Sequence, residues 1–179
     1  MKRLFLILLA AAFAVPYAAA QQAAAEVSLT FTRQSGRASN QFAVWVEDAQ
    51  GRHVRTLYAT RWTAAGGWRR RPTSIPVWVS RSGLAEMPRG QVDAVSGATG
   101  QTGRRTFVWD GTDGNGSPVP PGNYVIFVEG TLRWENQALF RAPISVGQGP
   151  AQAAVSVEFA GDSAAERGML SEVSVRSLR

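Results

Sequence analysis

Short segments in which apolar and polar residues alternate constrain the fold of this chain more than any other feature. Residues 27–31 and 42–46 alternate with a period of two, which places their apolar side chains on one face of a β-strand. Residues 54–58 follow the second segment across a turn that contains Gly51, so the two predict a hairpin. Further strands are expected at 106–109, 124–129, 138–146, 153–159 and 170–175, and a short edge or irregular segment at 75–79, which Pro76 interrupts.

Many short strands with turn residues between them are typical of two packed antiparallel sheets. The sequence therefore predicts an all-β fold, an immunoglobulin-like antiparallel β-sandwich. The exception is 61–103, where Gly, Pro, Trp and Arg occur without steady alternation and without an amphipathic helix of useful length. We expect one long irregular loop region there, and loops of that length in a compact domain are often functional.

Residues 1–20 have the three parts of a secretory signal peptide. Lys2 and Arg3 supply positive charge, 4–15 form an apolar run, and the alanines at 18–20 suit a cleavage site. The apolar run is shorter than the roughly 20 residues that cross a bilayer as a helix. The sequence thus predicts a periplasmic protein, secreted through this signal, with no membrane span in the mature chain.

After cleavage, we expect a disordered lead at 21–25 and a single β-sandwich domain at 26–179. Loss of the two charges of Lys2 and Arg3 lowers the formal net charge from +6 to +4. The arginines that remain are spread along the chain, apart from a run at 69–71, and do not form the basic stripe of a nucleic-acid-binding protein. No nucleic acid is therefore expected as a partner.

The composition excludes most familiar catalytic centres. The chain has no cysteine and a single histidine, His53. Without cysteine there is no disulfide, thiolate nucleophile or Cys-ligated metal, and one histidine does not make a multi-histidine metal site. A Ser-His-Asp triad would need His53, which begins a predicted strand after a hairpin and is expected to be exposed or to act as a cap. We therefore expect no catalytic residue and no metal site.

Residues 107–126, here called the WDG hairpin, are predicted to form a strand, a tight turn, a proline-stiffened linker and a second strand. Asp110 and Asp113 can accept hydrogen bonds from backbone amides in Asx turns. A calcium loop is the alternative, but it lacks EF-hand spacing and a final bidentate Glu. The segment resembles a hairpin of immunoglobulin-like domains such as that of the flagellar hook-capping protein, which implies a fold and not a flagellar function.

Residues 93–99, here called the DAVSGAT segment, are predicted to form a loop of small residues that ends in the hydroxyl of Thr99. Gly97 and Ala98 remove side-chain bulk beside that hydroxyl, so the peptide suits the cleft of another enzyme. A simple tight turn is the alternative that composition alone favours.

The DAVSGAT segment resembles the D-x-x-[ST]-G-A-[ST] flavinylation motif of FMN-binding domains in sodium-pumping quinone reductases and related redox complexes. The resemblance implies that a FAD:protein FMN transferase attaches FMN to Thr99 as a phosphoester. It also implies that Asp93 is the motif acid and that Ser96, Gly97 and Ala98 are the recognition core. Many such domains continue Thr-x-Thr-Ser, whereas this chain continues with GQTG.

The order of the motifs resembles that of one family, the predicted periplasmic proteins called DUF2271. Residues 44–57 contain VWVED, Gly51 and VRTL, and the DAVSGAT segment and the WDG hairpin follow. The resemblance spans roughly 26–177. It implies a carrier of covalent FMN in extracytoplasmic electron transfer, not a catalyst, with the FMN transferase and a PepSY-type membrane redox protein as partners. A cofactor-free immunoglobulin-like module that binds a cell-envelope partner is the alternative.

Three tryptophans and an arginine run lie in the irregular region: Trp62, Trp68, Trp78, Arg69, Arg70 and Arg71. One interpretation stacks an indole on the flavin and uses arginine to stabilise its reduced, anionic form. The alternative, which we favour for each residue singly, packs the tryptophans over the sandwich and leaves the arginines in a solvated loop. If flavin is present, we expect at least one member of the group to touch it.

Two further tryptophans and two acids have structural interpretations. Trp45 and Trp109 lie on alternating strands and are expected in the core. Glu47 and Asp48 are adjacent on a strand and therefore point to opposite faces. They are interpreted as turn acids and not as a paired-carboxylate site.

Overall fold

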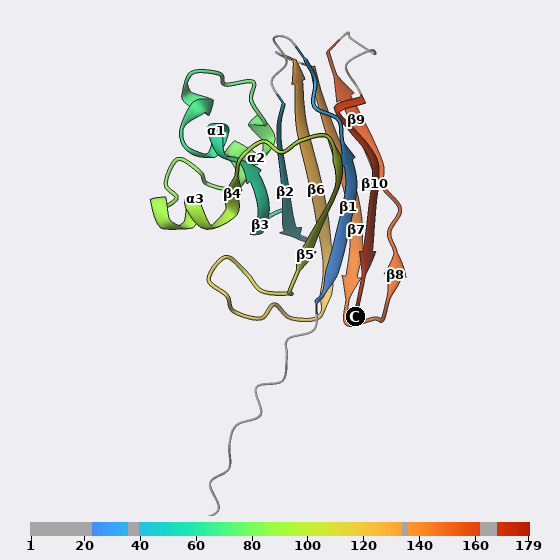
Figure 1. Ribbon diagram of the computed structural model, residues 1–179. Coiled ribbons are helices and arrows are strands. Elements are labelled where there is room, and N and C mark those ends of the chain that lie inside the picture. The colour runs from blue at the N-terminus through green and yellow to red at the C-terminus, as the bar shows by residue number, and fades with distance from the viewer. Residues whose placement is uncertain (1–22, 36–39, 134–135, 162–167) are drawn as a thin grey trace, which may run out of the picture.

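The computed structural model describes residues 23–35, 40–133, 136–161 and 168–179. Two β-sheets pack face to face as a sandwich, and short helices lie to one side of it (Figure 1). The predicted all-β sandwich is therefore confirmed. The predicted signal peptide, 1–20, lies outside the described residues.

Among the described residues, the smaller sheet has four strands and the larger sheet has six. The smaller sheet has the order β5 (Gly103–Trp109), β1 (Ala25–Phe31), β10 (Leu170–Ser177) and β8 (Ala151–Gln152). The larger sheet has the order β4 (Ser96–Gly97), β3 (His53–Thr60), β2 (Gln41–Asp48), β6 (Gly122–Arg133), β7 (Asn136–Val146) and β9 (Ser156–Ala160). Neighbouring strands are antiparallel, apart from β4, which runs parallel to β3.

Alternation determines which side chains fill the core between the two sheets. Val27 and Leu29 of β1 are buried there, and β2 contributes Val44 and Val46 from one of its faces. Trp109, at the end of β5, is fully buried in the same core, as predicted. Burial of each large apolar side chain contributes about 1.5–3 kcal/mol to the stability of the sandwich.

A second apolar cluster covers the outer face of the larger sheet. Trp45 lies one position along β2 from residues of the first core, so its side chain points to the opposite face. Its ring stacks on Phe127 of β6, with the ring centroids 5.1 Å apart. Trp78, which lies in a helix, and Ile75, which directly precedes that helix, are fully buried against this face. The larger sheet is therefore covered on both sides, and Trp45 is in a core as predicted.

Residues 61–103 were expected to be one irregular loop, but they fold into short helices and one short strand. We call them the helical segment. Its helices are α1 (Arg61–Ala64), the 3-10 helix η1 (Gly67–Arg69), α2 (Pro76–Arg81) and α3 (Arg89–Val95). In Figure 1 they lie beside β3 and β4. No helix in the described part of the chain is both long and apolar enough to cross a membrane.

The prediction of an edge or irregular segment at 75–79 is wrong, because these residues belong to α2 or precede it directly. Pro76 stands in the first turn of α2, where a missing backbone N–H costs no helical hydrogen bond. Val77 and Val79 are β-branched, and because such residues are common in strands, the composition of this run favours a strand.

The predictions for 21–25 and 153–159 also differ from the structure. Within the expected lead at 21–25, residues 21 and 22 lie outside the described residues, whereas Ala24 and Ala25 are fully buried and Ala25 begins β1. The strand expected at 153–159 begins only at Ser156, as β9, because residues 153–155 carry the chain from β8 in the smaller sheet to the larger sheet.

Candidate functional site

The DAVSGAT segment forms a helix end, a short strand and the beginning of a loop. Asp93 lies in α3, Ser96 and Gly97 form β4, and Ala98 and Thr99 lie in the loop that leads to β5. The prediction of a loop is therefore right for the last two residues and wrong for the others. Thr99 is half-buried and lies outside both apolar cores.

The pairing of β4 with the end of β3 fixes this loop on the larger sheet. Ser96 pairs with Ala59, and Gly97 pairs with Thr60, in a parallel register. Thr60 is the last residue of β3 and is followed directly by Arg61, the first residue of α1. The loop that carries Thr99 therefore leaves the sheet where the helical segment begins.

Tyr58 of β3 holds the start of the loop. Its hydroxyl donates hydrogen bonds to the carbonyl oxygens of Ala98, at 3.0 Å, and Gly97, at 3.4 Å. A Cβ atom at Gly97 would lie 2.8 Å from Cε2 of the Tyr58 ring, so this close approach requires glycine. Burial raises the pKa of Tyr58 against the opposing charge of Arg105, which keeps the phenol protonated and able to donate.

Arg105 of β5 holds the far end of the loop. Its Nη2 donates a hydrogen bond to the carbonyl oxygen of Gln101 at 2.5 Å. Its guanidinium lies so close to Gly100 that a Cβ atom there would overlap it. Thr99 therefore lies between two fixed points, Tyr58 on one side and Arg105 on the other, with a guanidinium against the next residue.

The two other polar residues of the DAVSGAT segment differ in exposure. Asp93 is exposed and lies 3.5 Å from the guanidinium of Arg61, which is also exposed. A surface ion pair of this kind contributes only about 0–1 kcal/mol to stability. The Ser96 hydroxyl is buried and has no hydrogen-bond partner among the described residues. Asp93 is thus accessible from outside, whereas Ser96 faces the protein.

A groove with a volume of about 460 Å³ lies next to the DAVSGAT segment, between α1 and α3. We call it the helical groove, and its volume is typical of small-molecule sites. Its walls are formed by Arg61, Ala64, Ala65, Gly66, Trp68, Arg69, Leu84, Ala85, Met87, Arg89, Val92 and Asp93. They combine an indole, aliphatic side chains and several arginines, so the groove suits an aromatic anion.

The three tryptophans of the helical segment have different surroundings. Trp78 is fully buried in the second core, which confirms the packing interpretation for this residue. Trp68 is half-buried and lines the helical groove, and the Arg69 guanidinium lies 4.7 Å from its ring centroid. Trp62 is 37% exposed, with the Arg71 guanidinium 5.0 Å from its ring, and it does not line the groove.

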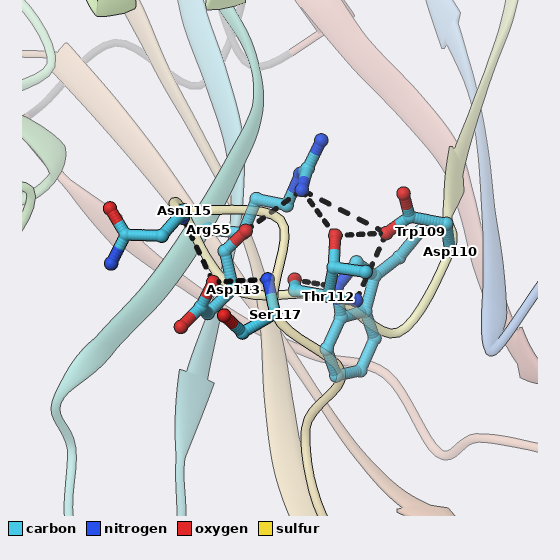
Figure 2. A network of polar contacts seen from close by, with 7 residues as sticks. All are labelled: Arg55, Trp109, Asp110, Thr112, Asp113, Asn115 and Ser117. Atoms are coloured by element: carbon cyan, nitrogen blue, oxygen red, sulfur yellow. Dashed lines mark hydrogen bonds and ion pairs between the residues drawn. The ribbon is translucent and has the colours of Figure 1, made fainter.

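Carboxylates fix the turn of the WDG hairpin by bonding to nearby amides (Figure 2). Oδ1 of Asp110 accepts hydrogen bonds from the amide and the hydroxyl of Thr112, at 3.0 and 2.7 Å. Oδ1 of Asp113 accepts from the amides of Asn115 and Ser117, at 2.8 and 2.9 Å. The predicted Asx turns are confirmed.

Arg55 of β3 joins the WDG hairpin to the larger sheet (Figure 2). It donates to the Thr112 hydroxyl and, at 2.8 Å, to the Asp113 carbonyl oxygen, and it lies 3.9 Å from the Asp110 carboxylate. Burial opposes ionisation of Asp110, but the hydrogen bonds from Thr112 and the charge of Arg55 outweigh it and lower the Asp110 pKa. Within the described residues, no three His, Cys, Asp or Glu side chains lie together as metal ligands.

Glu47 is a buried ion-pair partner, so its interpretation as a turn acid is wrong. Its Oε1 accepts a hydrogen bond from Nε1 of Trp45, and its Oε2 accepts one from Arg81 of α2, each at 2.7 Å. Arg81 is distant in the sequence, so no local pattern indicates this pair. Asp48 does lie in the turn, where its carboxylate accepts a hydrogen bond from the Arg52 amide at 2.9 Å, as predicted.

Glu129, in the middle of β6, has no motif around it that predicts its role. It is fully buried, and its carboxylate accepts hydrogen bonds from the amides of Val77, at 3.1 Å, and Trp78, at 2.7 Å. Burial raises the pKa of Glu129 to about 7, against these hydrogen bonds and the charge of Arg81. The one signal in the sequence is an acid within the otherwise apolar run 124–129.

His53 begins β3, as predicted, but it is half-buried rather than exposed. Its Nε2 lies 2.9 Å from the Thr56 hydroxyl oxygen. Burial lowers the pKa of His53 to about 4, so the ring is neutral at neutral pH.

A family model matches most of the chain. The family model of the predicted periplasmic proteins DUF2271 matches residues 22–164. The chain belongs to the DUF2271 family. The matched part of this DUF2271 chain includes the DAVSGAT segment and the WDG hairpin, and the family's description agrees with the predicted periplasmic location. No curated protein and no solved structure matches the chain.

Proposed function

We propose that this DUF2271 protein is a periplasmic electron carrier, to which a FAD:protein FMN transferase attaches FMN covalently at Thr99. The observation that supports this function is the position of Thr99, on a loop outside both apolar cores. Tyr58 and Arg105 hold that loop on either side of the threonine. A hydroxyl buried in the sandwich would be inaccessible to another enzyme, whereas Thr99 is half-buried on a loop outside both cores.

The residues next to Thr99 fit a phosphoester. Gly97 and Ala98 precede it with little side-chain bulk, which leaves room for the active site of the transferase. The Arg105 guanidinium lies against Gly100, the residue that follows Thr99. Arginine matches phosphate oxygens with paired N–H donors, and this proximity supports a role for Arg105 in holding a phosphate attached to Thr99.

The attachment exchanges a phosphoanhydride bond of FAD for a phosphoester bond to Thr99. Oγ1 of Thr99 forms a bond to the phosphorus of the FMN half of FAD, and the pyrophosphate bond to the AMP half breaks. AMP leaves with the bridging oxygen, and the threonine proton passes to a base of the transferase. When bound, FMN supplies electron transfer, while the chain holds the loop in place and surrounds the group with its own side chains.

Co-expression with the transferase tests this function by intact-mass spectrometry. We expect the secreted protein to gain the mass of one FMN minus one water. The gain should persist in Thr99→Ser, which keeps a hydroxyl, and in Thr102→Ala, which changes a threonine of the same loop. It should disappear in Thr99→Ala. An unmodified protein beside a transferase that loads a control substrate would refute the proposal.

A second candidate function is a cofactor-free module that binds a cell-envelope partner, and one observation favours it. β9 is the last strand of the larger sheet, and its Val157 and Phe159 are each 40% exposed. A partner can add a strand to such an edge. Cross-linking to an envelope protein that is lost in Val157→Lys, together with an unmodified Thr99, would favour this function over the first.

A further inference from the structure

We propose that the helical groove is the binding site for the flavin ring of the FMN carried by Thr99, with Trp68 as its aromatic wall. This inference rests on the proposed function and adds a location for the ring. Three arginines lie at the rim of the groove: Arg61, Arg69 and Arg89.

The buried and half-buried side chains that line the groove are apolar. Leu84 is buried in the second core, and Met87 and Val92 are half-buried beside it. Trp68 adds an indole that is half-buried at the same wall. A flat aromatic ring gains dispersion and stacking energy from such a surface, and stacked aromatic pairs contribute about 0.5–1.5 kcal/mol beyond the burial of area.

Positive charge is concentrated in the helical segment, which forms this groove. From residue 23 to 179, the helical segment holds six arginines and two acids, whereas the rest of the chain holds eleven arginines and eleven acids. The whole formal excess of positive charge therefore lies in the helical segment. A positive surface of this kind attracts anions, and a flavin ring that becomes anionic on reduction is stabilised by it in that form.

The groove lies within reach of the attachment point. Arg61, which lines the groove, follows Thr60 directly, and Thr60 pairs with Gly97. Thr99 is only two residues further along, a span of at most about 7 Å of extended chain. The ribityl chain of FMN separates its phosphate from its ring, so the ring of a group attached to the loop extends beyond it toward a neighbouring surface. Asp93, in the same groove wall, connects the DAVSGAT segment with this surface.

The test uses full-length protein co-expressed with the transferase, with attachment verified by intact mass for every variant. The readouts are flavin fluorescence, its anisotropy and the visible circular dichroism of the flavin. Trp68→Leu removes the aromatic wall, and Ala65→Leu fills the groove from an exposed position without changing either core. Trp62→Leu is the matched control, because Trp62 belongs to the same segment but does not line the groove.

We expect quenched flavin fluorescence and a visible dichroic band in the wild type and in Trp62→Leu. Fluorescence should rise severalfold, and the dichroic band should collapse, in both Trp68→Leu and Ala65→Leu while the mass of the adduct persists. Wild-type flavin signals in both groove variants would overturn this inference and leave the proposed function intact. Absence of the adduct from the wild-type protein would overturn both.

Discussion

Glu129 accepts a hydrogen bond from the backbone amide of Trp78 at 2.7 Å, which joins the middle of β6 to the helical segment. Two positions along the same face, Thr131 accepts one from the amide of Ile75 at 2.7 Å. Ile75 has a φ angle of 44°, a left-handed conformation that β-branched residues rarely adopt. The two side chains of β6 thus hold the start of α2 in a backbone conformation that it would not choose alone.

Replacement of Glu129 should loosen this attachment. Glu129→Ala leaves the amides of Val77 and Trp78 without an acceptor, and each unsatisfied buried group costs about 1–3 kcal/mol. We expect the free energy of unfolding, measured in urea, to fall by about 2–4 kcal/mol, and less in Glu129→Gln, which retains one acceptor oxygen. Glu158→Ala, on exposed β9, is the control and should change little. Equal losses in Glu129→Ala and Glu158→Ala would contradict this role.

Glu129 and His53 should give the stability opposite dependences on pH. The pKa of Glu129 is raised from 4.5 to about 7, so the folded state holds this proton more tightly and loses stability as the pH rises from about 4.5 to about 7. The pKa of His53 is lowered from 6.5 to about 4, so stability is lost as the pH falls from about 6.5 to about 4.

The two slopes therefore oppose each other between about pH 4.5 and 6.5 in the wild type. Urea unfolding across this range should show stability rising with pH in Glu129→Gln, where His53 titrates without the opposing effect of Glu129. In His53→Gln it should fall with pH. If the pH profiles of both variants run parallel to that of the wild type, Glu129 and His53 do not control the pH dependence of stability.

Gly97 should tolerate alanine poorly. The added Cβ atom would lie 2.8 Å from the Tyr58 ring, and either the ring or the loop must move. We expect Gly97→Ala to lower the unfolding free energy by about 1 kcal/mol or more, and to do so less in a Tyr58→Ala background, as a double-mutant cycle measures. Gly90→Ala is the matched control, since nothing lies within 4 Å of that Cβ position. Equal effects at Gly97 and Gly90 would exclude the proposed close contact.

The pair of Glu47 and Arg81 should respond unequally to the loss of either partner. The side chain of Glu47 is 2% exposed, whereas that of Arg81 is 42% exposed. Arg81→Ala leaves a buried carboxylate without its cation, which costs about 3–5 kcal/mol. Glu47→Gln leaves an arginine that reaches water, so its cost should be smaller. Thermal and urea unfolding of both variants compare the two costs. A larger loss of unfolding free energy in Glu47→Gln than in Arg81→Ala would contradict this prediction.

The strands could be predicted because their signal is local. Val44 and Val46 alternate with polar or outward-facing neighbours, and Gly51 marks the turn, so the hairpin of β2 and β3 follows from a window of a few residues. The helix α2 could not be predicted in this way. Its valines favour strands, and its position depends on Glu129, far along the chain.

In the candidate site too, local features could be predicted from the sequence, whereas contacts between distant residues could not. The sequence predicts a loop of small residues that ends in Thr99, and the structure has a loop at Ala98 and Thr99. Its supports, Tyr58 and Arg105, come from β3 and β5, and no spacing in the sequence connects them with the threonine. No sequence pattern predicts the helical groove either, because its walls come from short helices that lack regular amphipathic periodicity.

The two-residue length of β4 has a consequence for how the chain meets a modifying enzyme. An enzyme that acts on a peptide in a cleft needs that peptide drawn out from its own fold, and the energy required depends on how many contacts must open. Here only two residue pairs join β4 to β3, so local opening there leaves the long strands paired. We expect amides 96–102 to exchange with deuterium well before those of β2 and β6. Thr99, the proposed acceptor, thus directly follows the part of the sheet that we expect to open first.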